Sequence, residues 1–194
     1  MEKNTKKLVI AALMAAFTCV ATMIIKLPTP TFGYVHLGDG LVLLCGIVLG
    51  PLIGALSAGT GSMFADLFSG YLSFAPATFL IKALTAGAAG FLFHTLQTRT
   101  KSSARARNVC LAASGLIGEA IMVIGYFLYE AGMAAFASGG FTQAAIYAGI
   151  VSSAAGIPFN IVQGVTGIAI ALVLLPVLLK IPVTRQQIFT VPSR

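Results

Sequence analysis

The sequence predicts an all-α integral membrane protein, a single domain over residues 1–194 in which six transmembrane helices form a compact bundle. Hydrophobic residues make up 58% of the chain and charged residues only 9%, whereas soluble domains carry about 25% charged residues. The apolar residues fall in long runs of the kind that cross bilayers. The basic residues gather at the ends of these runs. This composition excludes a soluble enzyme, a disordered tail and a coiled coil.

The first helix is predicted at about residues 8–25. This run is longer than a typical signal-peptide core, and the Lys-Leu-Pro that follows it is not a small-residue cleavage site. We therefore expect a retained membrane helix and no cleaved leader.

The next apolar run divides at Gly50-Pro51, because proline lacks a donor N–H and glycine tolerates unusual backbone angles. In the last apolar run, Pro158 marks a break between a lead-in and a spanning helix. The five later helices are predicted at about residues 38–50, 51–69, 75–96, 108–129 and 146–179.

The basic residues predict the topology. By the positive-inside rule, Lys and Arg are enriched on the cytoplasmic side of a membrane protein. Six crossings place all but Lys26 and Lys82 on one side, which predicts both termini in the cytoplasm and explains the net charge of +7 without a nucleic-acid partner. The residues on that side are Lys3, Lys6, Lys7, Arg99, Lys101, Arg105, Arg107, Lys180, Arg185 and Arg194.

Neither cysteine nor histidine predicts a metal site. The three cysteines all fall in apolar runs, at spacings that match no metal motif or disulfide framework. His36 and His94 lack a set of ligands at metal spacing. We expect no metal, no cofactor and no catalytic residue.

Ionisable residues in the apolar runs point to a ligand site. Each costs about 2.5–3.5 kcal/mol at a helix centre, so such residues pair with one another or line a cavity. In the six-helix topology all of them lie at mid-depth or in the outer half, which predicts a ligand cavity that opens outward and is sealed beneath. They are Asp39, Asp66, Lys82, Glu119 and Glu130, with Asn160 and Gln163 at the same level.

Two features of this set have alternative interpretations. Lys82 is expected to pair with Glu119 or to meet an anionic ligand group; the alternative is a structural Lys–Glu or Asp–Lys pair that holds helices together. The aromatic residues in the outer connections, such as Tyr34 and Tyr71, suit a loop that folds over a ligand. Anchoring at the headgroup level is the alternative for each of them.

Three stretches of the chain resemble a known family. The segments "HLGD", "LGP", "AD" and "SGY" follow one another between residues 36 and 71, "IPFNIVQG" covers residues 157–164, and the first helix contains an Ala-x-x-x-Ala pattern. Together with the predicted helix count, these resemble the substrate-binding S components of energy-coupling factor (ECF) vitamin transporters. The most similar subgroup is the riboflavin type, which includes transporters for hydroxymethylpyrimidine and pyridoxine.

The resemblance implies a function and partners. An S component captures a water-soluble vitamin outside a prokaryotic plasma membrane and docks on an ECF module of one membrane scaffold subunit and two cytoplasmic ATPases, whose ATP hydrolysis topples it to carry the ligand inward. The chain has no Gly-x-x-x-x-Gly-Lys-Ser/Thr loop of its own. The family's alanine pattern contacts the scaffold subunit, and here Ala11, Ala12, Ala15 and Ala16 match it.

The resemblance also places the ligand site in the outer halves of the last three helices and in the outer loops. The expected ligand is pyridoxine or hydroxymethylpyrimidine, with riboflavin or another B vitamin as the alternative. Amide side chains would read the edge of a heteroaromatic ring and tyrosines would stack on it, while His36 and Asp39 contact the ligand or fix the first loop. The candidate residues are Lys82, Glu119, Tyr126, Asn160, Gln163, Tyr34, His36, Asp39 and Tyr71.

Two other classes of function remain alternatives. An autonomous small transporter or channel would need polar groups in the inner half as well, and the pattern does not provide them. A membrane-embedded enzyme would use a carboxylate–His–Lys set for acid–base work, but the sequence has no Ser–His or metal-ligand constellation.

Overall fold

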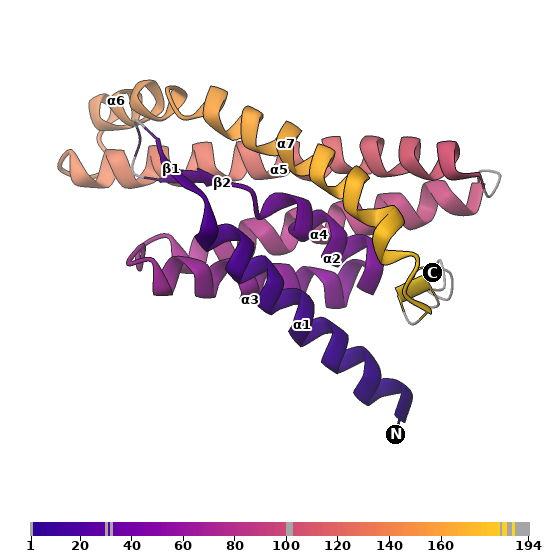
Figure 1. The fold of residues 1–194 in the computed structure, drawn as a ribbon. Helices are drawn as coiled ribbons and strands as arrows, with labels where there is room; N and C mark the ends of the chain where they lie inside the picture. The colour runs from indigo at the N-terminus through magenta and orange to yellow at the C-terminus, as the bar shows by residue number, and fades with distance from the viewer. Residues whose placement is uncertain are drawn as a thin grey trace.

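The computed structural model describes residues 2–29, 31, 33–99, 103–182, 184–185 and 188. Most of them are helical, which confirms the predicted class (Figure 1). Two short strands, β1 and β2, form an antiparallel hairpin in which Lys26 pairs with His36 and Pro28 with Tyr34. The elements are α1 (Glu2–Ile24), β1 (Lys26–Pro28), β2 (Tyr34–His36), α2 (Asp39–Leu49), α3 (Pro51–Phe68), α4 (Ala75–Arg99), α5 (Ala104–Ala137), α6 (Gln143–Ala154) and α7 (Ile157–Leu178).

Both predicted breaks are present. Gly50 separates α2 from α3 with φ of 84°, a conformation that glycine adopts without strain, and Pro51 starts α3. The last predicted segment is divided into α6 and α7 immediately before Pro158, which lies in the first turn of α7.

Helix α5 is longer than the predicted 108–129. It begins four residues earlier, where the Ser103 side chain accepts a hydrogen bond from the backbone N–H of Ala106, and it continues to Ala137. The prediction ended the helix at the polar side chain of Glu130. That carboxylate is buried inside the bundle instead, and the alanine-rich sequence after it favours helix.

The membrane-spanning character belongs to four helices of the described chain. Thr5–Ile24 of α1 and the whole of α4, α5 and α7 are long and apolar enough to cross a membrane, whereas α2 has only 11 residues. Large apolar side chains cover the outside of these helices; Leu8, for example, is 70% exposed. This pattern suits contact with lipid, because an aqueous surface rarely exposes so much apolar area. The count of six crossings remains a prediction.

Helix α2 forms the centre of the core. Its apolar side chains from Val42 to Leu49 are almost completely buried, and it contacts α1, α3, α4, α5 and α7. The short helix is continuously apolar, so every face of it packs against protein. It also places Asp39, its first residue, inside the bundle.

The two ends of the bundle differ in character (Figure 1). The start of α1, the end of α4, the start of α5 and the end of α7 lie at one end, and the predicted cytoplasmic basic residues that the structure describes lie in or next to these segments. The hairpin, α6 and the connection between α3 and α4 lie at the other end. Lys101 and Arg194 lie outside the described residues, and so does the side chain of Lys3.

Candidate functional site

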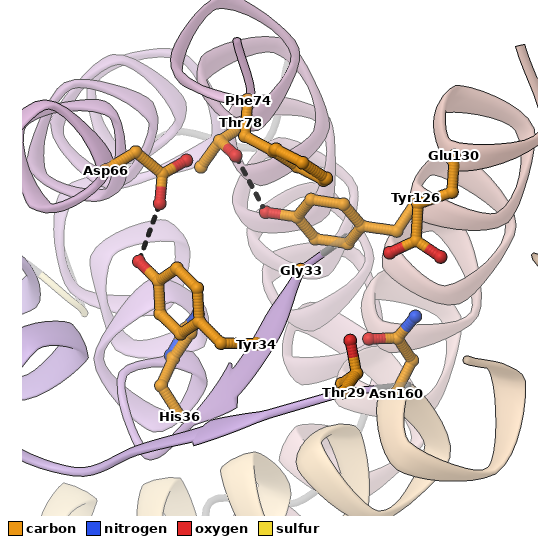
Figure 2. Close-up of a pocket in the computed structure, with 10 residues that line it drawn as sticks. All are labelled: Thr29, Gly33, Tyr34, His36, Asp66, Phe74, Thr78, Tyr126, Glu130 and Asn160. Carbon is orange, nitrogen blue, oxygen red and sulfur yellow. Dashed lines mark hydrogen bonds between the residues drawn. The ribbon is translucent and has the colours of Figure 1, made fainter. Parts of the chain in front are cut away.

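A buried polar pocket lies at the hairpin end of the bundle (Figure 2). The hairpin covers it, and α3, α4, α5 and α7 supply its walls. Its free space is about 20 Å³, on the order of one water molecule. The lining residues are Thr29, Gly33, Tyr34, His36, Asp66, Phe74, Thr78, Tyr126, Glu130 and Asn160.

Tyr34 fastens the hairpin to α3. Its hydroxyl donates a hydrogen bond of 2.6 Å to Oδ1 of Asp66, and its ring lies 4.6 Å from the ring of Tyr71. Burial and the nearby Asp66 carboxylate raise the pKa of Tyr34, so the phenol keeps its proton and remains the donor. The ammonium group of Lys26 lies 5.5 Å from the Tyr34 ring centroid and donates to the Ser69 hydroxyl.

The opposite wall is also aromatic. Tyr126 of α5 reaches across to α4, where its hydroxyl donates to Oγ1 of Thr78 at 3.1 Å. Phe74 packs edge-on against Tyr129, with ring centroids 5.3 Å apart. These rings supply flat apolar surfaces of the kind on which a heteroaromatic ring stacks.

Two carboxyl groups face the pocket from different sides, Asp66 from α3 and Glu130 from α5 (Figure 2). Each residue is only 4% exposed. Oδ2 of Asp66 and Oε2 of Glu130 are buried without a hydrogen-bond partner among the described residues. The Thr78 hydroxyl lies beside the Asp66 carboxyl group and the Thr31 hydroxyl beside that of Glu130. An unsatisfied buried acceptor costs about 1–3 kcal/mol, so a donor that enters the pocket recovers that energy.

His36 does not bring a positive charge to the pocket. Burial lowers the pKa of His36 to about 3, so its imidazole is neutral at pH 7. Its Nδ1 accepts a hydrogen bond from the backbone N–H of Gly38 at 3.0 Å. The ten lining residues therefore include two carboxyl groups and no Lys or Arg.

A second polar layer lies one to two helical turns below the pocket. Lys82 donates to Oδ1 of Asp39, and Nε2 of Gln163 donates to Oδ2 of the same carboxylate at 2.7 Å. Oε1 of Gln163 in turn accepts from the backbone N–H of His36 at 2.8 Å. This network joins α2, α4, α7 and the hairpin, and it satisfies both oxygens of Asp39.

The predicted partner of Lys82 is wrong. Lys82 pairs with Asp39 and not with Glu119, because the first turn of α2 brings the Asp39 carboxylate to the level of Lys82. The structural Asp–Lys alternative describes the observed contact. Glu119 is buried below the pocket beside Gly164, and both of its carboxyl oxygens lack a partner among the described residues.

The pocket contains only part of the predicted ligand-binding set. Tyr34, His36, Tyr126 and Asn160 line it. Tyr71 packs against Tyr34 from outside. The other four predicted residues belong to the layer beneath: Asp39, Lys82, Glu119 and Gln163.

Six lining residues were outside the predicted ligand-binding set, although the sequence contains signals for several of them. Asp66 and Glu130 are ionisable groups in the apolar runs. Thr78 lies four residues before Lys82 and Glu130 four residues after Tyr126, which puts each on the same helical face as a predicted residue. The contributions of Thr29 and Gly33 depend on the hairpin fold, which helix periodicity does not reveal.

The alanines of α1 divide into two faces. Ala11 is buried and Ala15 partly buried against α3, where a Cβ atom on Gly61 would lie 2.3 Å from the Ala15 carbonyl oxygen. Ala12 and Ala16 are exposed. The second pair is therefore the more accessible one. In the part of the chain that the structure describes, no three His, Cys, Asp or Glu residues are grouped to hold a metal ion.

Comparison with known proteins identifies the family. The family model described as "ECF-type riboflavin transporter, S component" matches residues 2–180, which is most of the chain. This chain belongs to that family of ECF S components. The resemblance found in its sequence motifs is thereby confirmed.

Two solved structures share the fold of this chain, and a further protein is similar to it in sequence. The solved structure of the S component of a bacterial ECF transporter superimposes with a TM-score of 0.62 at 20% identity, covering 91% of this chain and 97% of that one. The S component for biotin from an ECF-type ABC transporter gives a TM-score of 0.52 at 15% identity, covering 90% and 93%. An uncharacterized Pyrococcus woesei protein is 32% identical over 108 residues, 55% of this chain and 66% of that relative.

Proposed function

We propose that this S component binds a small water-soluble vitamin in the pocket beneath the hairpin, with pyridoxine or hydroxymethylpyrimidine as the preferred ligand. The observation that supports this most directly is the pocket itself, in which aromatic rings and buried carboxyl oxygens without a partner among the described residues surround one small space. Ligand pockets usually measure about 300–1,000 Å³. Because the free space is about 20 Å³, a one-ring vitamin requires less rearrangement than the three-ring riboflavin.

Entry of the ligand requires the hairpin to move. Side-chain contacts hold its outer part over the pocket: the Tyr34–Asp66 hydrogen bond, the Lys26–Ser69 hydrogen bond and the Tyr34–Tyr71 ring contact. The backbone N–H of His36 ties the base of the hairpin to Gln163 in the layer below, so the hairpin would swing about that end. The polar layer below is firmly paired through Asp39, so the floor of the pocket stays in place while its cover opens. A pocket with a movable cover and a fixed floor is suited to capture from one side of a membrane.

The same proposal includes a topology and a partner. The chain crosses a prokaryotic plasma membrane six times with both termini in the cytoplasm, and the hairpin end faces outward. An ECF module of a membrane scaffold subunit and two ATPases drives transport, and the scaffold subunit docks on the exposed Ala12 and Ala16 of α1. The grouping of the basic residues at the end of the bundle away from the hairpin supports this orientation.

Ligand identification tests the proposal. Protein purified in detergent is denatured, the released small molecules are identified by mass spectrometry, and binding is then measured by calorimetry with pyridoxine, hydroxymethylpyrimidine and riboflavin. Substitution Tyr126→Phe should weaken binding, while Tyr147→Phe on an exposed face of α6 serves as the matched control. Failure of every B vitamin to bind below micromolar concentration contradicts the proposal. Vitamin flux into liposomes without the ATPase module would favour an autonomous transporter instead.

A further inference from the structure

The charges at the hairpin end of the bundle are unbalanced. Four of the five acidic residues of the chain, Asp39, Asp66, Glu119 and Glu130, are buried at or just below the pocket. The nearby ammonium groups are those of Lys26 and Lys82. Lys82 is paired with the Asp39 carboxylate. Lys26 donates to the neutral Ser69 hydroxyl and keeps its charge 5.5 Å from the Tyr34 ring centroid, but it is not part of the pocket lining. Asp66 and Glu130 therefore face the pocket without a neutralising side chain in its lining.

The pocket also lacks strong donors for an anionic ligand. Its side-chain donors are hydroxyl groups, the amide of Asn160 and a neutral imidazole. The Tyr34 and Tyr126 hydroxyls already donate to Asp66 and Thr78. A ligand carboxylate or phosphate would be buried beside two carboxyl groups with little to hydrogen-bond it, and burying an unpaired charge is costly.

We propose that Asp66 and Glu130 are the specificity residues of this site, and that they select an uncharged or cationic heteroaromatic ligand with a hydrogen-bond donor at each end and exclude anionic ones. One donor binds Oδ2 of Asp66 and the other Oε2 of Glu130, two acceptors that have no hydrogen-bond partner among the described residues. The aromatic ring of the ligand, between these two donors, would lie in the space among Tyr34, Phe74 and Tyr126, whose side chains are drawn in Figure 2. This inference rests on the proposed function and adds the chemical class of the ligand.

Asp66 joins ligand selection to closure of the hairpin. Its Oδ1 accepts a hydrogen bond from the Tyr34 hydroxyl, while its Oδ2 remains for the ligand. One carboxylate would therefore contact both the hairpin and the ligand. A ligand donor on Oδ2 also stabilises the rotamer that holds Tyr34 in place. An anionic ligand would instead repel Asp66 and disfavour the closed hairpin.

The test uses ligands that differ in one group. The first series has a common pyridine ring with an aminomethyl, hydroxymethyl or carboxylate substituent: pyridoxamine, pyridoxine and 4-pyridoxic acid. The second compares riboflavin with its phosphate ester, and the third compares hydroxymethylpyrimidine with its phosphate ester. Calorimetry on the full chain in detergent gives a ratio of dissociation constants within each series. The ratio does not change if a variant is partly unfolded, because both ligands meet the same folded fraction.

The wild-type protein should bind the uncharged or cationic member of its preferred series at least about tenfold more tightly than the anionic member. The free energy of one hydrogen bond to a charged group is similar to the free energy of a tenfold change in affinity. Asp66→Asn and Glu130→Gln each replace an acceptor with a donor of the same shape, and each should lower that ratio by about tenfold. Gln143→Glu adds an exposed carboxylate at the start of α6 and should leave the ratio within about twofold, because solvent screens it.

Each outcome separates this inference from the proposed function. If a vitamin binds tightly but its carboxylate or phosphate analogue binds equally well, the inference is overturned and the vitamin-binding function stands. An unchanged ratio in both Asp66→Asn and Glu130→Gln overturns it in the same way. If no vitamin in any series binds the wild-type protein, the proposed function fails and this inference fails with it.

Discussion

Lys82 and Asp39 form an ion pair in which both side chains are fully buried. Asp39 opens α2, where the positive end of the helix dipole also favours a carboxylate. Gln163 binds the second carboxylate oxygen, so α2, α4 and α7 meet at one charged point below the pocket. The buried charges predicted to contact a ligand thus hold together the floor of the pocket.

Removing one member of this pair should destabilise the protein strongly. Lys82→Met leaves the Asp39 carboxylate buried without its cation, and breaking a buried pair in this way costs about 3–5 kcal/mol. We expect a lower midpoint of thermal unfolding in detergent, and weakened ligand binding as a consequence.

The double variant separates charge from packing. Lys82→Met combined with Asp39→Leu removes both charges, and it should recover much of the lost stability because an apolar pair of similar volume replaces the ion pair. Lys180→Met, an exposed residue beyond α7, is the control and should change the unfolding midpoint little. A double variant no more stable than the single one would show that the geometry, and not the unpaired charge, is what matters.

The contact between α2 and α4 depends on two glycines. A Cβ atom on Gly46 would lie 2.0 Å from the carbonyl oxygen of Ala86, and one on Gly90 would lie 2.5 Å from that of Gly46. Gly46→Ala should therefore push the helices apart and destabilise the fold by about 1–3 kcal/mol, the usual cost of overpacking a core.

Gly87 of α4 provides a control for this effect. A Cβ atom there would meet its nearest neighbour, Ala55, at 3.5 Å, which is ordinary contact. Gly87→Ala should be neutral or stabilising by up to about 1 kcal/mol, because alanine favours helix over glycine. Thermal unfolding of the two variants side by side decides the point; equal destabilisation would contradict a specific close approach at Gly46.

His36 predicts how stability depends on pH. Its pKa of about 3 in the folded protein lies below the ordinary value of 6.5, so between these values the unfolded chain binds a proton that the folded chain does not. Stability should therefore fall as the pH drops below about 6.5, by at most about 1.4 kcal/mol per pH unit.

The variant His36→Asn isolates this effect. An asparagine side chain offers an acceptor near the place of Nδ1, which receives the backbone N–H of Gly38, but it does not titrate. The difference in unfolding free energy between the two proteins should shrink as the pH falls from 7 to 5. Since both proteins retain His94, a parallel loss of stability in wild type and variant would rule out His36 as the cause.

The sequence predicted the helical class and the polar end of this fold for physical reasons. The apolar runs and the Gly50-Pro51 break depend only on local composition and backbone geometry. Because burying a charge in an apolar environment is costly, the presence of Asp39, Lys82 and Glu119 in apolar segments indicates an internal polar region. That argument locates the region but does not say which member contacts a ligand.

The distribution of roles within that region depends on tertiary contacts. Whether Lys82 meets Asp39, Glu119 or a ligand is decided by the level at which α2 begins, and single-sequence periodicity does not determine this. The hairpin also depends on tertiary contacts. It brings Thr29 and Gly33 to the pocket, whereas the sequence between the first two helices predicts only an irregular loop. The length of α5 was missed because Glu130 suggested a helix end while its side chain faces the interior.

The exposed alanines of α1 should affect transport without affecting ligand binding. Ala12 and Ala16 present small side chains on the outside of the bundle, where close approach of another helix needs small residues. Ala16→Leu should abolish vitamin uptake in cells that carry the ECF module, while calorimetry on the purified protein still gives the wild-type affinity. The proposed ligand pocket lies beneath the hairpin, and neither Ala12 nor Ala16 is among its lining residues.

Two further variants make the result specific. Ala169→Leu adds the same bulk to an exposed position on α7 and should leave uptake intact if α1 is the docking face. Ala15→Leu should lower stability as well as uptake, because Ala15 packs closely against Gly61 of α3. If Ala16→Leu reduced ligand binding and uptake equally, α1 would stabilise the pocket and would not form the docking surface for the ECF module. If Ala16→Leu transported normally, the docking surface would have to lie on another exposed helix.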